Sequence, residues 1–290
     1  MIGTVIVLTL VQGFIYAMLA SGMNLVFGIG GMLNLTHTSY LMLAGYSLYY
    51  FTKELGWGNL PSIGLSVIGV ILLSILIYRL FLDKVRHHAE AILLITVALA
   101  LIIQETMLLI FGDHYLSTTR IIPGVVEILG VRVPNQYLLI IGATGALFVI
   151  LWLVLTKTKL GLALGASASD AEVASLVGIN TSTIMQISIG IATFLAAVAG
   201  VLVASLWTIS PSMWLDPILM ILVVLIMGGL GSLKGSIIAA FIIALVEVLT
   251  QLFVPNGVHL STPFVMIVLI IVLITKPEGL FGITFEAEKL

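Results

Sequence analysis

The chain has 290 residues, of which 61% are hydrophobic and only 8% are charged. Soluble domains carry about 25% charged residues, so this composition excludes a soluble globular protein. The formal net charge is −2 and the chain contains no cysteine, which leaves no basic excess for nucleic-acid binding and excludes disulfides and thiolate chemistry.

Apolar runs long enough to cross a membrane recur along the whole sequence. A helix needs about 20 apolar residues to cross a hydrocarbon core of about 30 Å, so the sequence predicts an all-α polytopic membrane protein with about nine spans, between eight and ten. The predicted spans are residues 2–27, 35–51, 60–81, 91–111, 137–155 and 183–206, a seventh from about 218, an eighth that ends at 253 and a ninth that ends near 275. No polar segment is long enough for a soluble domain, so residues 1–290 are expected to form a single transmembrane domain.

Two polar segments between the spans have recognisable local patterns. Residues 112–136 form the longest loop, and pieces 124–129 and 131–133 predict a small hairpin. Residues 157–180 are small and Ala-rich, and a short helix is predicted over residues 169–177, because Gly178 offers a helix stop and Asn180 can cap the next helix. A short surface helix suits the docking of a soluble partner; an ordinary cytoplasmic loop is the alternative that the spacing leaves open.

The Lys and Arg residues of the short loops predict the orientation in the membrane, because cytoplasmic loops carry an excess of them. If the loop with Lys84 and Arg86 is cytoplasmic, alternation of nine spans leaves only Lys53, Arg120 and Arg132 outside, and the other eight of the 11 Lys and Arg residues fall inside. This places the N-terminus outside and the C-terminus in the cytoplasm.

Two glycine-rich segments, residues 27–34 and 227–234, interrupt the apolar pattern, and each is followed by another span. Interrupted helices at corresponding places in two halves of a transporter often mark the transport path. Glycine also serves tight turns between helices, and the sequence leaves both interpretations open. On the path interpretation, the candidate residues are Gly30, Gly31, Asn34, His37, Gly228, Gly229 and Gly231.

Two pairs of polar side chains inside predicted spans include a carboxyl group. Gln104 precedes Glu105 in the fourth span, and Gln251 lies one helical turn after Glu247 in the eighth. A carboxyl group in the membrane is costly unless it is paired, protonated or hydrated. A polar wall or a proton relay is one interpretation; a hydrogen bond between helices is favoured, because neither span contains a basic partner.

No pattern in the sequence predicts an enzyme, a metal site or a cofactor site. Lys234-Gly235-Ser236 has the wrong order for a phosphate-binding loop, which needs Lys after the second glycine. His37 has no carboxylate or second histidine at helical spacing, and no Ser-His-Asp set has a plausible geometry. We therefore expect no catalytic residue, no metal and no cofactor, and an intramembrane enzyme is disfavoured.

Four stretches together resemble one family. They are Gly30-Gly-Met-Leu-Asn34-Leu-Thr-His37, Asp170-x-x-x-Ala174-x-x-x-Gly178-Ile179-Asn180, Ala196-Ala-Val-Ala-Gly200-Val-Leu and Gly228-Gly-Leu-Gly-Ser232-Leu-Lys-Gly235. In order and spacing, across nearly the whole chain, they resemble the permease subunit of bacterial or archaeal branched-chain amino acid ABC transporters, the LivH type. The chain departs from the family pattern at Thr38, where Gly is usual, and at Leu162 and Gly165, where Arg is usual.

The resemblance implies a multi-pass permease of the bacterial or archaeal plasma membrane that is not itself an enzyme. It implies cytoplasmic ABC ATPase subunits, a second permease subunit (the same or similar), an extracytoplasmic substrate-binding protein and surrounding lipid as partners. The implied ATPase-docking residues are Ser169, Asp170, Glu172, Ala174, Gly178 and Ile179. Within this set we expect Asp170 and Glu172 to present carboxylates to the ATPase and Ala174 to permit its close approach. The alternatives are a permease for urea or short amides, which belong to the same superfamily, and an ion- or proton-coupled carrier that uses Glu105 or Glu247.

Overall fold

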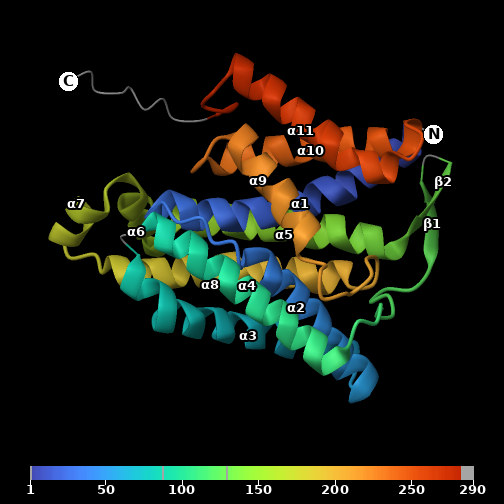
Figure 1. Ribbon diagram of the computed structural model, residues 1–290, viewed down its shortest axis with the longest axis horizontal. Coiled ribbons are helices and arrows are strands. Elements are labelled where there is room, and N and C mark those ends of the chain that lie inside the picture. Colours follow the sequence, from blue (N-terminus) through green and yellow to red (C-terminus); the bar gives the residue numbers. More distant parts are fainter. Residues whose placement is uncertain (1, 87, 129, 282–290) are drawn as a thin grey trace.

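The computed structural model describes residues 2–86, 88–128 and 130–281. Long helices lie side by side and run along one common direction (Figure 1). The helices are α1 (Ile2–Gly30), α2 (His37–Tyr49), α3 (Asn59–Ile77), α4 (Ala89–Phe111), α5 (Asn135–Lys157), α6 (Lys159–Ser169), α7 (Ala171–Leu176), α8 (Thr181–Val203), α9 (Leu215–Gly228), α10 (Leu233–Phe253) and α11 (Gly257–Thr275). Short π- or 3₁₀-helical turns extend two of them: η1 (Tyr50–Glu54) after α2, then η2 (Tyr78–Leu82) and η3 (Asp83–Val85) after α3. The strands are β1 (Val125–Ile128) and β2 (Val131–Pro134).

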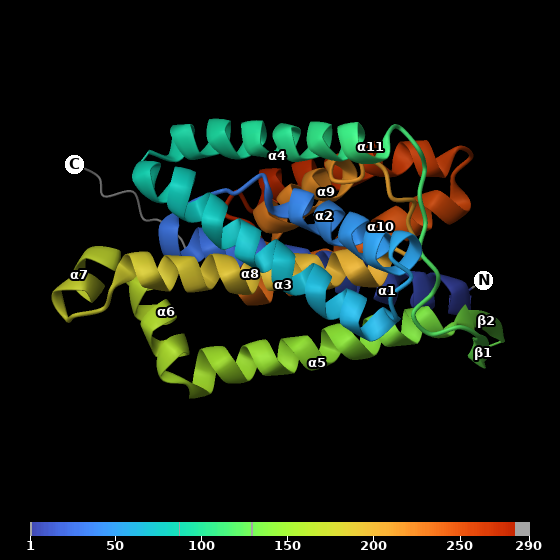
Figure 2. The ribbon, with the colours of Figure 1, turned by 90° about the horizontal axis from the view of Figure 1, so that it is seen from below.

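The molecule has two different ends. The start of α1 and the strands β1 and β2 lie at one end, which we call the hairpin end, and α6 and α7 lie at the opposite end, which we call the α7 end (Figure 1). Seen from the perpendicular direction, α4 and α5 lie along opposite edges of the bundle (Figure 2). The polar segment that the sequence singled out therefore projects from one end of a helical bundle.

Among the described residues, seven helices are long and apolar enough to cross a membrane: α1, α3 with its extensions, α4, α5, α8, α10 and α11. Two other predicted spans correspond to shorter helices, because α2 has 13 residues before η1 continues it and α9 has 14. At 1.5 Å per residue, α9 is about 21 Å long, which is less than a hydrocarbon core of about 30 Å. The prediction of an all-α polytopic membrane protein is confirmed; the count of nine spans and the orientation stay predictions.

The bundle is packed around α1. Every residue from 15 to 26 is buried, although a helix with one covered face buries only a stripe. α1 reaches this burial because it contacts α5, α8, α9 and α10. Its lack of a polar stripe in the sequence is therefore explained by its central position.

Small side chains allow α8 to approach its neighbours closely. Ala196, Ala197 and Ala199 are fully buried. Gly200 faces the backbone carbonyl of Leu41 in α2, and a Cβ atom at this position would collide with that carbonyl. The small residues of α8 are thus contact positions, as is usual where membrane helices pack closely.

The predicted hairpin is present at the hairpin end. β1 and β2 pair in an antiparallel register that places Val126 opposite Val133. Leu129, which the prediction included, lies outside the described residues. A side chain from the start of α5 joins the hairpin region to the bundle, because Gln136 donates from Nε2 to the carbonyl oxygen of Leu202 at 2.9 Å.

The segment between α8 and α9, residues 204–214, is mostly non-helical, although several of its side chains are buried. Ile209 is fully buried and Trp214 is 5% exposed. Leu116 of the long loop pairs with Ile209 through two backbone hydrogen bonds of 2.9 and 2.8 Å. The sixth predicted span, about residues 183–206, corresponds to α8, which ends at Val203 and is followed by turns.

Candidate functional site

The polar segment between α5 and α8 forms two short helices instead of the single predicted one. Asp170 separates them with an extended backbone, and its Oδ1 accepts hydrogen bonds from the backbone N–H groups of Glu172 and Val173, both at 2.9 Å. Asp170 is thus the N-cap of α7. The sequence analysis missed α6, although Thr158 was a usable signal, since its hydroxyl oxygen caps α6 by accepting from the N–H of Gly161 at 3.1 Å.

The exposed surface of α7 is apolar at its tip. Val173, Leu176 and Val177 are 54%, 80% and 73% exposed, and we call these three side chains the α7 tip. Exposed apolar side chains grouped in this way are typical of a protein interaction site. The sequence analysis did not single them out, although their spacing of three and four residues places them on one face of a helix.

Ala174 lies on the inner face of α7. Its side chain is only 3% exposed, so it is not part of the exposed surface of α7, and its role in docking stays a prediction. Ile179 is half-buried, and its N–H donates to the carbonyl oxygen of Ala174 at 3.1 Å. Of the other predicted docking residues, those on the exposed surface are Ser169, Asp170, Glu172 and Gly178.

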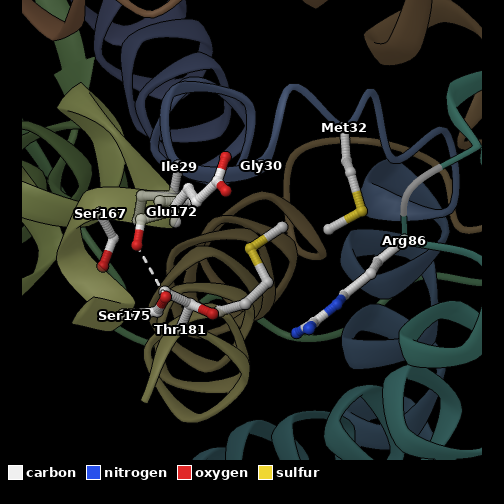
Figure 3. A pocket seen from close by; sticks show the side chains of 10 residues that line it. Ile29, Gly30, Met32, Arg86, Ser167, Glu172, Ser175 and Thr181 are labelled. Atoms are coloured by element: carbon white, nitrogen blue, oxygen red, sulfur yellow. Dashed lines mark hydrogen bonds between the residues drawn. The ribbon is translucent and has the colours of Figure 1, made fainter. Parts of the chain in front are cut away.

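A cavity of about 530 Å³ lies beneath α7 (Figure 3). Glu172 and Arg86 lie on opposite sides of it, and the thioether side chain of Met32 comes from the segment after α1 (Figure 3). Ser175 donates from its hydroxyl to the backbone oxygen of Glu172 at 2.7 Å, so part of the polar lining is bonded within α7 itself. Because of this cavity, α7 is not packed tightly against the helix ends on that side.

Polar contacts tie the segment after α3 to the start of α8, directly beyond α7. Asp83 Oδ1 accepts from Tyr78 Oη at 2.9 Å and from Ser182 Oγ at 3.1 Å. Arg79 donates from Nε and Nη2 to Gln186 Oε1 at 3.0 and 2.9 Å. These bonds connect the end of α3 with α8, the helix that follows α7 in the chain.

The two glycine-rich segments meet at the α7 end. The second forms the turn between α9 and α10, where Gly229 and Gly231 have φ angles of 99° and 84°, which are favourable only for glycine. Asn24 of α1 holds this turn: its Nδ2 donates to the carbonyl oxygen of Ser232 at 2.9 Å, and its Oδ1 accepts from the N–H of Gly231 at 2.6 Å. Asn24 also bonds the hydroxyl of Ser236.

The second glycine-rich segment thus has the geometry of a tight turn between helices. Gly228 packs so closely against Gly235 that a Cβ on either residue would meet the other's backbone. The segment after α11 adds two backbone hydrogen bonds, from Leu280 to the carbonyl oxygen of Met227 at 2.7 Å and from Phe281 to that of Gly228 at 3.2 Å. A role for Gly228, Gly229 and Gly231 in the path stays a prediction.

The first glycine-rich segment differs, because α1 continues through Gly28 and ends only at Gly30. Gly30 and Gly31 are exposed at the α7 end, and Gly30 lines the cavity beneath α7. Asn34 and His37 are buried: Asn34 Oδ1 accepts from the N–H of Thr36 at 3.1 Å, and His37 Nε2 lies 3.1 Å from the carbonyl oxygen of Leu19. Their place in a path stays a prediction.

The pair around Glu247 forms a closed network between α1 and α10. Glu247 is 7% exposed. Its Oε2 accepts from Tyr16 Oη at 2.8 Å and from Gln12 Nε2 at 3.4 Å, and its Oε1 accepts from Gln251 Nε2 at 3.1 Å. The geometry is that of the favoured interpretation, an interhelical hydrogen bond.

The pair around Glu105 is arranged differently. Gln104 donates from Nε2 to Glu105 Oε1 at 3.2 Å and accepts from the indole Nε1 of Trp214 at 2.7 Å. Glu105 is exposed. In the part of the chain that the structure describes, no group of three or more His, Asp or Glu residues is placed to hold a metal ion.

A family model described as branched-chain amino acid transport system / permease component matches residues 5–275. The chain belongs to this permease family. The permease is 27% identical to the high-affinity branched-chain amino acid transport system permease protein LivH of Salmonella typhimurium, over 96% of its own length and 94% of that protein. It is 26% identical to the protein BraD of Pseudomonas aeruginosa, whose name describes the same kind of permease, over 97% of its own length and 95% of that protein.

The likeness extends to an archaeal protein and to a solved structure. The permease is 26% identical to the probable branched-chain amino acid transport permease protein LivH of Methanocaldococcus jannaschii, over 94% of its own length and 90% of that protein. PsaBC from Streptococcus pneumoniae in complex with Fab shares its fold, with a TM-score of 0.54 at 12% identity over 92% of the permease and 90% of that chain. The family resemblance and the transporter class are therefore confirmed, and the permease is a membrane transport component of a family that is not enzymatic.

Proposed function

We propose that the permease is the membrane-spanning subunit of an ABC importer for branched-chain amino acids, in the plasma membrane of a bacterium or archaeon. The names of the similar permeases support this substrate class. The proposal includes nine spans, with the hairpin end outside and the α7 end in the cytoplasm. Cytoplasmic ATPase subunits hydrolyse ATP, and this chain provides the path and its alternating access.

The α7 tip is the observation that carries the ATPase-docking part of the proposal. Its three exposed apolar side chains belong to a short helix that lies at one end of the bundle (Figure 1), where a soluble partner can reach them. The ends of α3 and α5 at the same end carry Lys84, Arg86 and Lys157. An excess of such residues is typical of the cytoplasmic side, where an ATPase can reach them.

The cavity beneath α7 supports a coupling mechanism with two positions of this helix. Movement of α7 relative to the cavity changes the position of the start of α8, and the bonds of Asp83 and Arg79 carry this change to α3. An ATPase that binds one position of α7 more tightly then shifts the balance between two states of the path. A second permease subunit completes the path, and a binding protein delivers substrate at the hairpin end.

Copurification and uptake test this proposal. The permease would be expressed with its ATPase, second permease and binding-protein partners, and uptake of leucine, isoleucine, valine, urea and acetamide would be measured in proteoliposomes. We expect uptake of the branched-chain amino acids that requires ATP. If only urea or acetamide is taken up, the substrate is a short amide and not a branched-chain amino acid. If a proton or sodium gradient drives uptake without ATP, the protein is a secondary carrier and not part of an ABC importer.

A matched pair of variants tests the docking surface. Leu176→Asp places a charge on the α7 tip and should abolish ATPase copurification, whereas Val125→Asp makes the same kind of change at the exposed hairpin and should leave it intact. Equal copurification of both variants would exclude the α7 tip as the docking surface. Ala174→Arg is unsuitable here, because Ala174 is buried and arginine would disrupt the packing of α7 itself.

A further inference from the structure

The exposed face of α4 is apolar except near one carboxylate. Leu101 and Leu109, one turn before and one turn after Glu105, are 46% and 86% exposed and share its face. Glu105 lies six residues before Phe111, the last residue of α4, which places it about 9 Å inside the helix from the hairpin end. In the part of the chain that the structure describes, Glu105 has no ion-pair partner. A carboxylate in this position is unfavourable in lipid unless water or a cation reaches it.

The neighbouring helix α9 gives an independent reason to place water here. Gly231 lies next to Gly28 of α1, so α9 ends at the α7 end. α9 is only about 21 Å long, so with its last residue taken as one boundary of a 30 Å hydrocarbon core, its first residues lie about 9 Å short of the other boundary, at the depth of Glu105. The hydrogen bond of 2.7 Å between Trp214 and Gln104 agrees with this depth.

The chain that leads into α9 is non-helical at this depth. Irregular backbone inside a membrane is tolerated only where protein covers it or where it lines a water-filled cavity. The hydroxyl groups of Ser205 in this segment and of Thr118 in the loop beside it are buried and have no hydrogen-bond partner among the described residues. Protein covers much of this irregular segment, and the two buried hydroxyl groups leave polar atoms without partners in the described part of the chain, close to Glu105 and Gln104.

We infer that Glu105 lies in the aqueous transport path near its outer opening and receives the α-ammonium group of the transported amino acid. This inference rests on the proposed function. An amino acid that enters the path loses water from its ammonium group, and a carboxylate replaces that water with charge-assisted hydrogen bonds. Gln104 positions the carboxylate by donating to Oε1 while Trp214 holds Gln104, and the apolar side chain of the substrate meets Leu101 and Leu109.

Labelling of single cysteines tests the environment of Glu105. The chain contains no cysteine, so one introduced cysteine reports one position. Leu101→Cys lies one turn deeper than Glu105, and Ala146→Cys is a control at similar depth on the exposed face of α5, along the opposite edge of the bundle (Figure 2). Each labelling rate is divided by the rate of the same reagent with a free thiol in solution, because a thiolate itself attracts cations. On this scale, in the assembled transporter, a cationic methanethiosulfonate should label Leu101→Cys at least about tenfold faster than an anionic one, and Glu105→Gln should remove this preference. Ala146→Cys should react with neither reagent.

Two labelling results would overturn the inference. If Leu101→Cys is as unreactive as Ala146→Cys, this face of α4 is covered by lipid or by protein. If Leu101→Cys reacts equally with both reagents and Glu105→Gln changes nothing, the face is wet but Glu105 does not attract cations. The labelling needs no transport, so it is independent of whether the proposed substrate is correct.

Uptake measurements then test the role of the carboxylate. Glu105→Gln should lower the maximal rate of ATP-dependent leucine uptake about tenfold, because a neutral amide binds ammonium less well than a carboxylate does. The concentration of loaded binding protein that gives half the maximal rate should not change, and Glu105→Asp should recover part of the rate. Thr106→Val is the matched control, since among the described residues the Thr106 hydroxyl donates to the backbone oxygen of Ile102 and to no other group.

Uptake by Glu105→Gln at the wild-type rate would overturn the inference while the proposed function stands. Absence of ATP-dependent uptake of amino acids by the wild-type transporter would overturn the proposed function instead. The two failures are therefore distinguishable.

Discussion

Glu247 and Glu105 have the same description in the sequence: each is a carboxylate in an apolar helix with a glutamine nearby. In the structure, Glu247 is enclosed by donors from α1 and α10, whereas Glu105 faces outward with one glutamine beside it. The environment of such a carboxylate depends on which helix packs against its own. Glu247 lies on α10, which packs against the central helix α1. Among the described residues, no element covers the outer face of α4 around Glu105. A carboxylate that is enclosed by donors contributes to stability, and one that is left outside is free to serve transport.

The largest effect that would test this comparison is expected for Glu247→Ala. The change removes the acceptor of Tyr16 and leaves buried donors without partners, so we expect a loss of about 2–3 kcal/mol in the free energy of unfolding. Thermal unfolding in detergent, followed by the fraction of monodisperse protein, would measure it. A melting temperature equal to that of the wild type would mean that the network does not stabilise the bundle.

Tyr16→Phe should have a smaller effect of about 1 kcal/mol, because it removes one donor and keeps the ring. The same unfolding measurement applies, and Tyr40→Phe is a control for loss of a buried tyrosine hydroxyl in another part of the core. We expect Tyr16→Phe to be the more destabilising of the two, since Tyr16 donates to a carboxylate. The reverse order would contradict the importance given to Glu247.

Trp214→Phe should cost about 1 kcal/mol of stability, because the indole N–H bond to Gln104 is lost and the smaller phenyl ring leaves part of the buried site unfilled. The rate of leucine uptake should fall by more than the loss of folded protein explains, since Gln104 is then free to rotate away from Glu105. Parallel measurement of unfolding and of leucine uptake separates the two. If uptake falls only in proportion to the amount of folded protein, Trp214 has a structural role only.

Glu105→Ala should have the smallest effect on stability, within about 0.5 kcal/mol, as is usual for an exposed side chain. The unfolding experiment used for Glu247→Ala provides the direct comparison. Destabilisation as large as that of Glu247→Ala would show that both carboxylates are structural, and the contrast between them would disappear.

The sequence was sufficient for those features that depend on one segment at a time. Apolar runs predicted the long helices, and turn and cap residues predicted the β-hairpin and the start of α8, where Asn180 Oδ1 accepts from the N–H of Thr183 at 3.1 Å. The family followed from four motifs whose order is preserved along the chain.

Features that depend on a second segment could not be predicted. Ala174 is buried in a short helix that packs against α6 and α8, and no spacing within α7 reveals which side these helices cover. Glu247 and Glu105 differ only through α1 and the exposed face of α4. α9 is short because its chain enters the bundle after a buried irregular segment, and apolar residues on both sides conceal that boundary in the sequence.

The backbone bonds from Leu280 and Phe281 to the end of α9 have a consequence for biosynthesis. These two donors follow α11 in the chain, so the ribosome releases them only after α9, α10 and α11 have entered the insertion machinery. Until then, the carbonyl groups of Met227 and Gly228 lack these partners. The turn that Asn24 holds from the first helix thus gains its last backbone hydrogen bonds only after α11 has been synthesised, so folding at the α7 end is completed after the spans themselves have been made.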